Sequence, residues 1–156
     1  LWKKHPGAED TIREAIAGAA KIATKAHGDI AVVLTDDSAM QALNKRWRGQ
    51  DKPTNVLSFP AQAMPGGGGG AHLGDIVIAF ETVAGEAECD GKSFAHHLAH
   101  LAVHGYLHLL GHDHETDSQA HAMERLETEI LARLDVPDPY AGDNAAADAT
   151  MQKSHA

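Results

Sequence analysis

Residues 104 to 114 decide the fold, because they hold four histidines, three of which have the spacing that a catalytic metal site requires. The segment reads His104-Gly105-Tyr106-Leu107-His108-Leu109-Leu110-Gly111-His112-Asp113-His114. On a helix, the Cβ atoms of His104 and His108 are roughly 5–6 Å apart on one face, so both imidazoles can bind one ion. Gly111 lets the chain leave the helix and turn back, which brings His114 or His112 to the same ion. A fourth position left to water is the arrangement of a catalytic zinc.

An alternative interpretation is that these histidines form a polar helix face or hydrogen-bonded core residues. Spacing alone does not select the metal-binding pair, because one i, i+4 ridge carries His96, His100, His104 and His108. Of these, only the last pair is followed by a helix-ending glycine and further histidines. His100 is therefore a candidate for supporting the site or facing a substrate. We expect three other histidines to be surface residues: His96, His97 and His121.

The same spacing occurs in metzincin peptidases, whose motif is H-E-x-x-H-x-x-G-x-x-H. The glutamate after their first histidine is the general base, and this chain has Gly105 at that position. Amide hydrolysis needs such a group, so the substitution disfavours a peptidase. A metal that lowers the pKa of bound water to about 7 still supports hydrolysis of an ester or a phosphodiester.

Composition indicates one domain without a membrane anchor. The chain has 156 residues, of which 43% are hydrophobic, enough for a single core. We expect one metallohydrolase domain over residues 1–140 and a disordered tail over 141–156, where apolar residues are scarce. No apolar stretch is long enough to span a membrane, no signal peptide is visible, and Cys89 is the one cysteine. These features predict a cytoplasmic location.

Hydrophobic periodicity predicts an α+β fold, with helices packed on a small mixed β-sheet and a metzincin-like metal helix at the centre. Residues 30–34 form a β-branched run typical of a buried strand, and residues 56–59 lie between prolines, which favours an edge strand. A third strand is expected at residues 73–79. Helices are expected to start at Thr11, Ser38, Ser93 and Thr116, each a residue that can cap a helix.

A basic stretch from Asn44 to Asn55 carries four cations and one acid, in a chain of net charge -9. The overall charge argues against coating nucleic acid by bulk electrostatics, so an anionic substrate needs a local site of this kind. The planar guanidinium of arginine suits phosphate. Alternatively, Lys45, Arg46 and Lys52 complement a helix dipole and are simply solvated.

Four blocks of the chain form a recognisable pattern: residues 48–60 (RGQDKPTNVLSFP), residues 73–78 (LGDIVI), the histidine segment and residues 138–140 (DPY). In these blocks the chain resembles the YbeY family of metal-dependent endoribonucleases. The resemblance implies one Zn²⁺ per chain, held by His104, His108 and His114, with His112 not a ligand. Arg48 and His104 are the implied catalytic residues. The implied partners are single-stranded RNA, rRNA and the ribosome, and the implied roles are maturation of the 16S rRNA 3′ end and quality control of 70S ribosomes.

Two other functions stay open from the sequence. One is a metallopeptidase of metzincin-like ancestry, which Gly105 disfavours. The other is a non-enzymatic ribosome-assembly factor with a structural zinc, in which His112 or Asp113 would close the fourth position.

Overall fold

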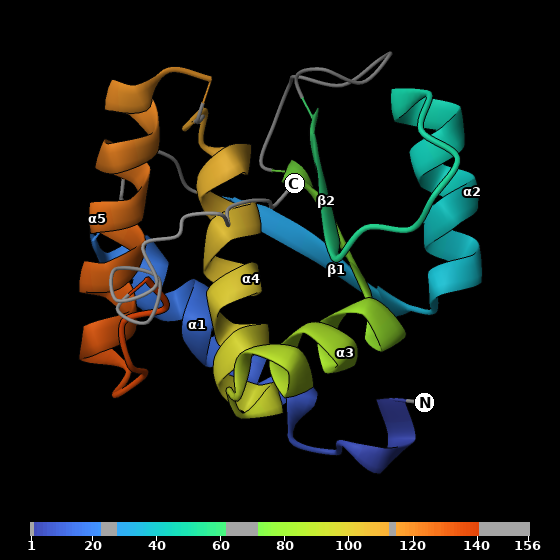
Figure 1. The fold of residues 1–156 in the computed structure, drawn as a ribbon. Helices are drawn as coiled ribbons and strands as arrows, with labels where there is room; N and C mark the ends of the chain where they lie inside the picture. Colours follow the sequence, from blue (N-terminus) through green and yellow to red (C-terminus); the bar gives the residue numbers. More distant parts are fainter. Residues whose placement is uncertain (1, 23–27, 62–71, 113–114, 141–156) are drawn as a thin grey trace.

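The computed structural model describes residues 2–22, 28–61, 72–112 and 115–140. Within these residues the fold is α+β, as predicted, with helices on a small mixed sheet (Figure 1). The elements, in chain order, are η1 (Trp2–Lys4), α1 (Ala8–Ile22), β1 (Asp29–Thr35), α2 (Asp37–Arg48), β2 (Val56–Pro60), β3 (His72–Ala79), α3 (Phe80–Asp90), α4 (Phe94–Leu109) and α5 (Asp117–Arg133). The glycine run at residues 66–70 and the tail from 141 lie outside the described residues.

β3 is the central strand of the sheet. The order is β1-β3-β2, with β1 parallel and β2 antiparallel to β3. The run Ile76–Ala79 is buried throughout, as a strand covered on both faces requires. β2 is an edge strand, as its flanking prolines predicted. The prediction of a buried first strand is wrong, because β1 is the other edge within the described sheet and Val33 is 47% exposed.

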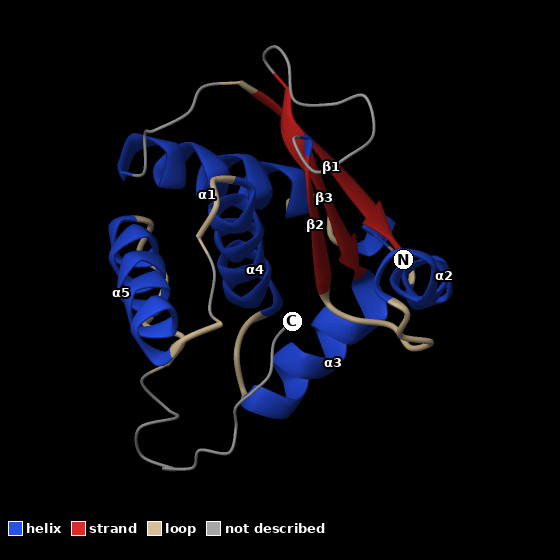
Figure 2. Cartoon of the chain, turned by 90° about the horizontal axis from the view of Figure 1, so that it is seen from above, coloured by secondary structure: helices blue, strands red, loops and turns tan. Residues whose placement is uncertain are grey.

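The two faces of the sheet are covered by different helices (Figure 2). Successive residues of a strand point to opposite faces. On one face, Val56 and Ile76 join the large core formed with α1, α4 and α5. On the other, Leu57 and Val77 pack with Met40 of α2. The edge strand β2 therefore contributes side chains both to the α4 side and to the α2 side.

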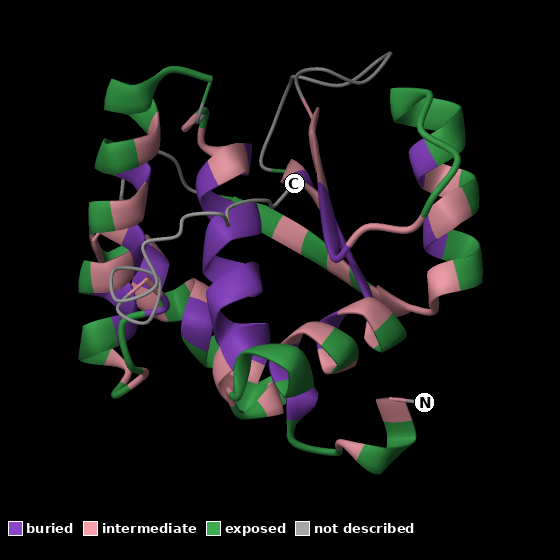
Figure 3. Ribbon diagram, in the orientation of Figure 1, coloured by how far each residue is buried: buried purple, intermediate pink, exposed green. Residues whose placement is uncertain are grey.

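α4 is the central helix of the larger core and is buried along almost its whole length (Figure 3). Ser93 caps its first turn by accepting a hydrogen bond from the His96 amide at 3.0 Å, as predicted. The helix packs closely on the sheet at Gly105. A Cβ atom there would lie 3.1 Å from Ile76 Cγ2 and 3.2 Å from Ser58 Oγ. A side chain at this position would require the neighbouring side chains of β2 and β3 to shift by a few tenths of an ångström.

The predicted helix starts are partly right. Thr116 caps α5 with a complete capping box, in which the Gln119 side chain also contacts the Thr116 amide. The predicted starts at Thr11 and Ser38 are wrong. α1 begins at Ala8, where the 3₁₀ turn η1 feeds into it through a bond from the Ala8 amide to His5. α2 is capped by the Asp36 carboxylate, which accepts from the Ala39 amide at 2.8 Å.

α3 was not predicted. It buries only Val83 and Ala87, and its N-cap residue, Ala79, has no side chain that can cap the first turn. The Thr82 amide instead donates to the carboxylate of Asp37 on α2 at 3.0 Å, so neither hydrophobic periodicity nor a local cap marks α3 in the sequence. It follows β3 directly and packs beside α4. Among the described helices, none is long and apolar enough to cross a membrane.

Candidate metal centre

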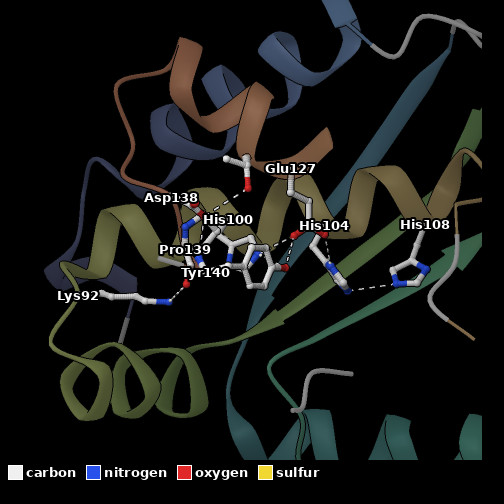
Figure 4. Close-up of polar contacts among 9 residues, drawn as sticks. Lys92, His100, His104, His108, Glu127, Asp138, Pro139 and Tyr140 are labelled. Atoms are coloured by element: carbon white, nitrogen blue, oxygen red, sulfur yellow. Dashed lines mark hydrogen bonds and ion pairs between the residues drawn. The ribbon is translucent and has the colours of Figure 1, made fainter. Parts of the chain in front are cut away.

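His104 and His108 come together on the last two turns of α4 (Figure 4). Their Nε2 atoms are 3.1 Å apart. Two ligands of a tetrahedral ion, each at about 2.0–2.1 Å, are separated by roughly 3.3–3.4 Å. The pair therefore has nearly the spacing that one shared metal ion requires.

The helix ends where the glycine signal predicted. Gly111 has φ +99°, and the His112 amide donates to the carbonyl of Leu107 at 3.0 Å, closing the last turn. His114 lies outside the described residues, so the third ligand stays a prediction. Within the part of the chain that the structure describes, no group of three or more His, Cys, Asp or Glu side chains is arranged to hold a metal.

Glu127, on α5, hydrogen-bonds to the ring of His104 and fixes its orientation (Figure 4). Its carboxylate is fully buried and accepts a hydrogen bond from His104 Nδ1 at 2.6 Å. A proton on Nδ1 leaves the lone pair of the neutral ring on Nε2, which is the nitrogen that faces His108. The residues present therefore fit a metal ion, because the tautomer that can bind one is fixed by a carboxylate.

The same carboxylate has two further partners. His100 Nε2 lies 2.9 Å from Glu127 Oε1, and the hydroxyl of Tyr140 donates to that same oxygen. His100 is buried, and its hydrogen bond to Glu127 makes it a supporting residue of the site. Tyr140 belongs to the segment after α5, which Lys92 also holds through the carbonyl of Pro139 at 3.3 Å.

Burial and hydrogen bonding act in opposite directions on Glu127. Burial alone raises the pKa of its carboxyl, but the hydrogen bonds from His100 and His104 outweigh burial and lower the pKa below its ordinary value. Burial lowers the pKa of His100 more than Glu127 raises it. The cluster therefore holds an ionised Glu127 beside a neutral His100.

Sequence reasoning missed Glu127, although a signal was present. Residue 127 is four positions after Met123 and three before Ile130, two buried residues of the apolar face of α5. A carboxylate on that face has to be paired to be tolerated. The expectation for His97 was wrong. It is buried, and its Nε2 lies 2.8 Å from Oε1 of Glu86 on α3.

Arg48 is the last residue of α2 and is exposed. Its side chain has no ion pair or hydrogen bond within the described residues, and no contact joins it to His104 or His108 there. The C-terminal ends of α2 and α4 lie at the same end of the molecule, with β2 between them (Figure 1). β2 contacts both sides, since Ser58 Oγ donates to the carbonyl of Gly105 at 3.0 Å and the ring of Phe59 is 6.1 Å from that of Trp47.

The fold and this site define an α+β protein whose central helix presents a carboxylate-anchored histidine pair. A family model described as Endoribonuclease YbeY matches residues 3–135. The chain therefore belongs to the YbeY endoribonuclease family, as the sequence motifs predicted.

Relatives named Endoribonuclease YbeY match most of the chain. The protein of Bradyrhizobium sp. (strain BTAi1 / ATCC BAA-1182) is 56% identical over 146 residues, covering 90% of this chain and 86% of the relative. That of Bradyrhizobium diazoefficiens is 53% identical, covering 90% and 80%. That of Nitrobacter winogradskyi is 54% identical, covering 90% and 77%.

Proposed function

We propose that this protein is a zinc-dependent endoribonuclease that hydrolyses phosphodiester bonds of single-stranded RNA. The observation that carries the proposal is the histidine pair, with Nε2 atoms 3.1 Å apart and one ring fixed by a buried carboxylate. Membership of a family whose relatives are named endoribonucleases supports RNA as the substrate.

His104, His108 and His114 would hold the ion. When bound, zinc supplies Lewis-acid stabilisation of phosphate charge and lowers the pKa of a bound water. Glu127 keeps the proton of His104 on Nδ1, so that Nε2 is free to bind. Arg48 has an exposed guanidinium that would bind the scissile phosphate in a bidentate manner and neutralise charge as the bond breaks.

The proposed biological setting is the maturation of the 16S rRNA 3′ end and quality control of 70S ribosomes in the cytoplasm. This part of the proposal rests on the family resemblance. The proposed partners are single-stranded RNA, rRNA and the ribosome, and not a membrane.

The packing around Gly105 also disfavours the peptidase alternative. The position of the missing glutamate lies against Ser58 and Ile76, so a longer side chain at Gly105 would require these neighbours to move. The alternative of a non-enzymatic assembly factor with a structural zinc differs in its fourth ligand, which would come from the protein.

The test incubates one zinc-loaded preparation with single-stranded RNA, duplex RNA and unfolded casein. The controls are a chelated sample and the His108→Ala and Arg48→Ala proteins. We expect cleavage of single-stranded RNA but not of duplex RNA or casein, and we expect all three controls to lose this cleavage. Casein hydrolysis with intact RNA would replace the proposal with the peptidase. Tightly bound zinc without reaction on any substrate would favour the assembly factor.

Metal analysis of single variants tests the ligand assignment. His104→Ala, His108→Ala and His114→Ala should each lose zinc, whereas His112→Ala should retain most of it. Loss of zinc from His112→Ala with retention in His114→Ala would show that the third ligand is misassigned.

A further inference from the structure

Trp47, in the last turn of α2, is exposed in a way that packing does not explain. Only two large hydrophobic residues of the described chain are exposed, Val33 at 47% and Trp47 at 44%. The indole lies edge-on to Phe59 of the sheet, with the two ring planes at an angle of 67° and their centroids 6.1 Å apart. Much of the ring therefore stays open to solvent, although burial of a tryptophan is strongly favourable.

The stretch of chain that carries this ring is cationic, and one of its cations lies over the ring. The guanidinium carbon of Arg46 lies 5.3 Å from the indole centroid. Arg48 and Lys52 are also exposed, whereas Lys45 is paired with Asp51 at 3.9 Å. In a chain of net charge -9 this stretch is a local exception, and an occupant of opposite charge is favoured.

An open aromatic ring among cations is the arrangement by which proteins bind single-stranded nucleic acid. The cations contact the phosphates while a base stacks on the ring, and the stacking tolerates any base because every base has a π face. Bases in a duplex are stacked on each other and cannot reach such a ring. The geometry thus favours an unpaired base over paired ones.

The position of the ring relates it to the histidine pair. Phe59, which contacts Trp47, and Ser58, which contacts α4 at Gly105, are neighbours on β2 and point to opposite faces. Single-stranded RNA that crosses the end of β2 would therefore pass from the α2 side of the sheet, which carries Trp47, to the α4 side, which carries the histidine pair.

We propose that Trp47 is a stacking subsite for an unpaired base of single-stranded RNA, with Arg46 and Lys52 contacting the adjacent phosphates. This inference rests on the proposed function, because it assigns the subsite to the same substrate. It adds a reason for single-strand selectivity, namely that a base has to be unpaired to occupy the ring.

Tryptophan fluorescence tests the subsite directly. The sequence has two tryptophans, so a Trp2→Phe background leaves Trp47 as the reporter. The zinc-loaded full chain is titrated with a short single-stranded 2′-O-methyl oligouridylate and with an abasic sugar–phosphate oligomer of equal length. We expect strong quenching by the first and little by the second.

Affinities of variants give the second readout. Trp47→Ala should weaken oligouridylate binding about five- to a hundredfold, the range found for loss of one stacked base. Trp47→Phe should recover most of the affinity, and Val33→Ala, at the other exposed hydrophobic position, should bind like the parent chain. Melting temperatures of all variants show that each is folded.

The outcomes separate this inference from the proposed function. If the wild type cleaves RNA and Trp47→Ala binds oligouridylate as tightly, the subsite is wrong and the proposed function stands. If the wild type neither binds nor cleaves single-stranded RNA, both fail. Equal quenching by the abasic oligomer, or by an acidic peptide, would also overturn the stacking subsite.

Discussion

Replacing Glu127 with glutamine should weaken metal binding while the protein stays folded. The carboxylate accepts from three donors, His104, His100 and Tyr140, whereas an amide offers one oxygen and an NH₂ group. In the arrangement of lowest free energy, the amide oxygen accepts the hydrogen bonds from His100 and Tyr140. The NH₂ group then donates to Nδ1 of His104, which has to carry its proton on Nε2, the nitrogen meant for the metal.

The magnitudes follow from this arrangement. Loss of a partner that sets the tautomer of a ligand histidine typically lowers metal affinity about 10- to 100-fold. The metal-free fold loses the charge assistance of a buried hydrogen bond, about 1–3 kcal/mol. For a domain of this size, that corresponds to a fall of roughly 3–10 °C in melting temperature.

The assay measures zinc affinity by competition with a chromogenic chelator, and melting temperature of the chelated protein by circular dichroism. Nitrogen NMR of labelled histidines reports which ring nitrogen of His104 carries the proton. The control is Glu129→Gln, which removes an exposed carboxylate of the same helix that is paired with Arg133 at 3.4 Å. We expect it to change zinc affinity and stability very little.

A Glu127→Gln protein that binds zinc as tightly as the wild type would show that the carboxylate does not control metal binding. A proton on Nδ1 of His104 in that variant would show that the amide does not control the tautomer. A loss of affinity shared equally by Glu129→Gln would point to long-range charge as the cause.

Three further predictions concern packing, pH and the arginine. Gly105→Ala should lower the free energy of unfolding by about 1–3 kcal/mol, because the added Cβ meets Ile76 and Ser58. Gly85→Ala, in open space on α3, should raise it by about 0.4–1 kcal/mol. Chemical denaturation measures both, and an unchanged stability of Gly105→Ala would contradict the close packing. Metal-free protein should lose stability as pH falls below 6.5, because the lowered pKa of His100 lets only the unfolded state take up the proton. Urea denaturation at several pH values should show this loss, and His100→Gln should reduce it. Arg48→Ala should keep zinc and melting temperature but lose most RNA cleavage, and Arg48→Lys should restore it only in part; unchanged cleavage would remove Arg48 from the site.

Local signals in the sequence were sufficient for the parts of the fold that are capped or strongly periodic. Ser93 and Thr116 mark the starts of α4 and α5, and the prolines around residues 56–59 mark an edge strand. α3 had no such signal. The exposure of β1 depends on which strand lies beside it, which is a property of the sheet and not of residues 30–34.

For the candidate site, the histidine pair was predictable, whereas the sequence signalled only that Glu127 is buried and not which residues it contacts. The i, i+4 spacing brings His104 and His108 together on any helix. Glu127 and Tyr140 reach His104 and His100 only because α5 and the segment after it pack on α4, over sequence separations of 23 and 40 residues. Contacts of that range follow from tertiary packing, which no local pattern encodes.

The close approach at Gly105 also controls the register in which β2 pairs with β3. If β2 slipped by one residue, Phe59 would take the place of Ser58 against α4. The space there does not hold even a Cβ on the helix without tight contact, so a phenyl ring is excluded. Steric repulsion therefore disfavours this slipped register of β2. Gly105 of α4 thereby keeps Phe59 on the face of the sheet where it contacts Trp47.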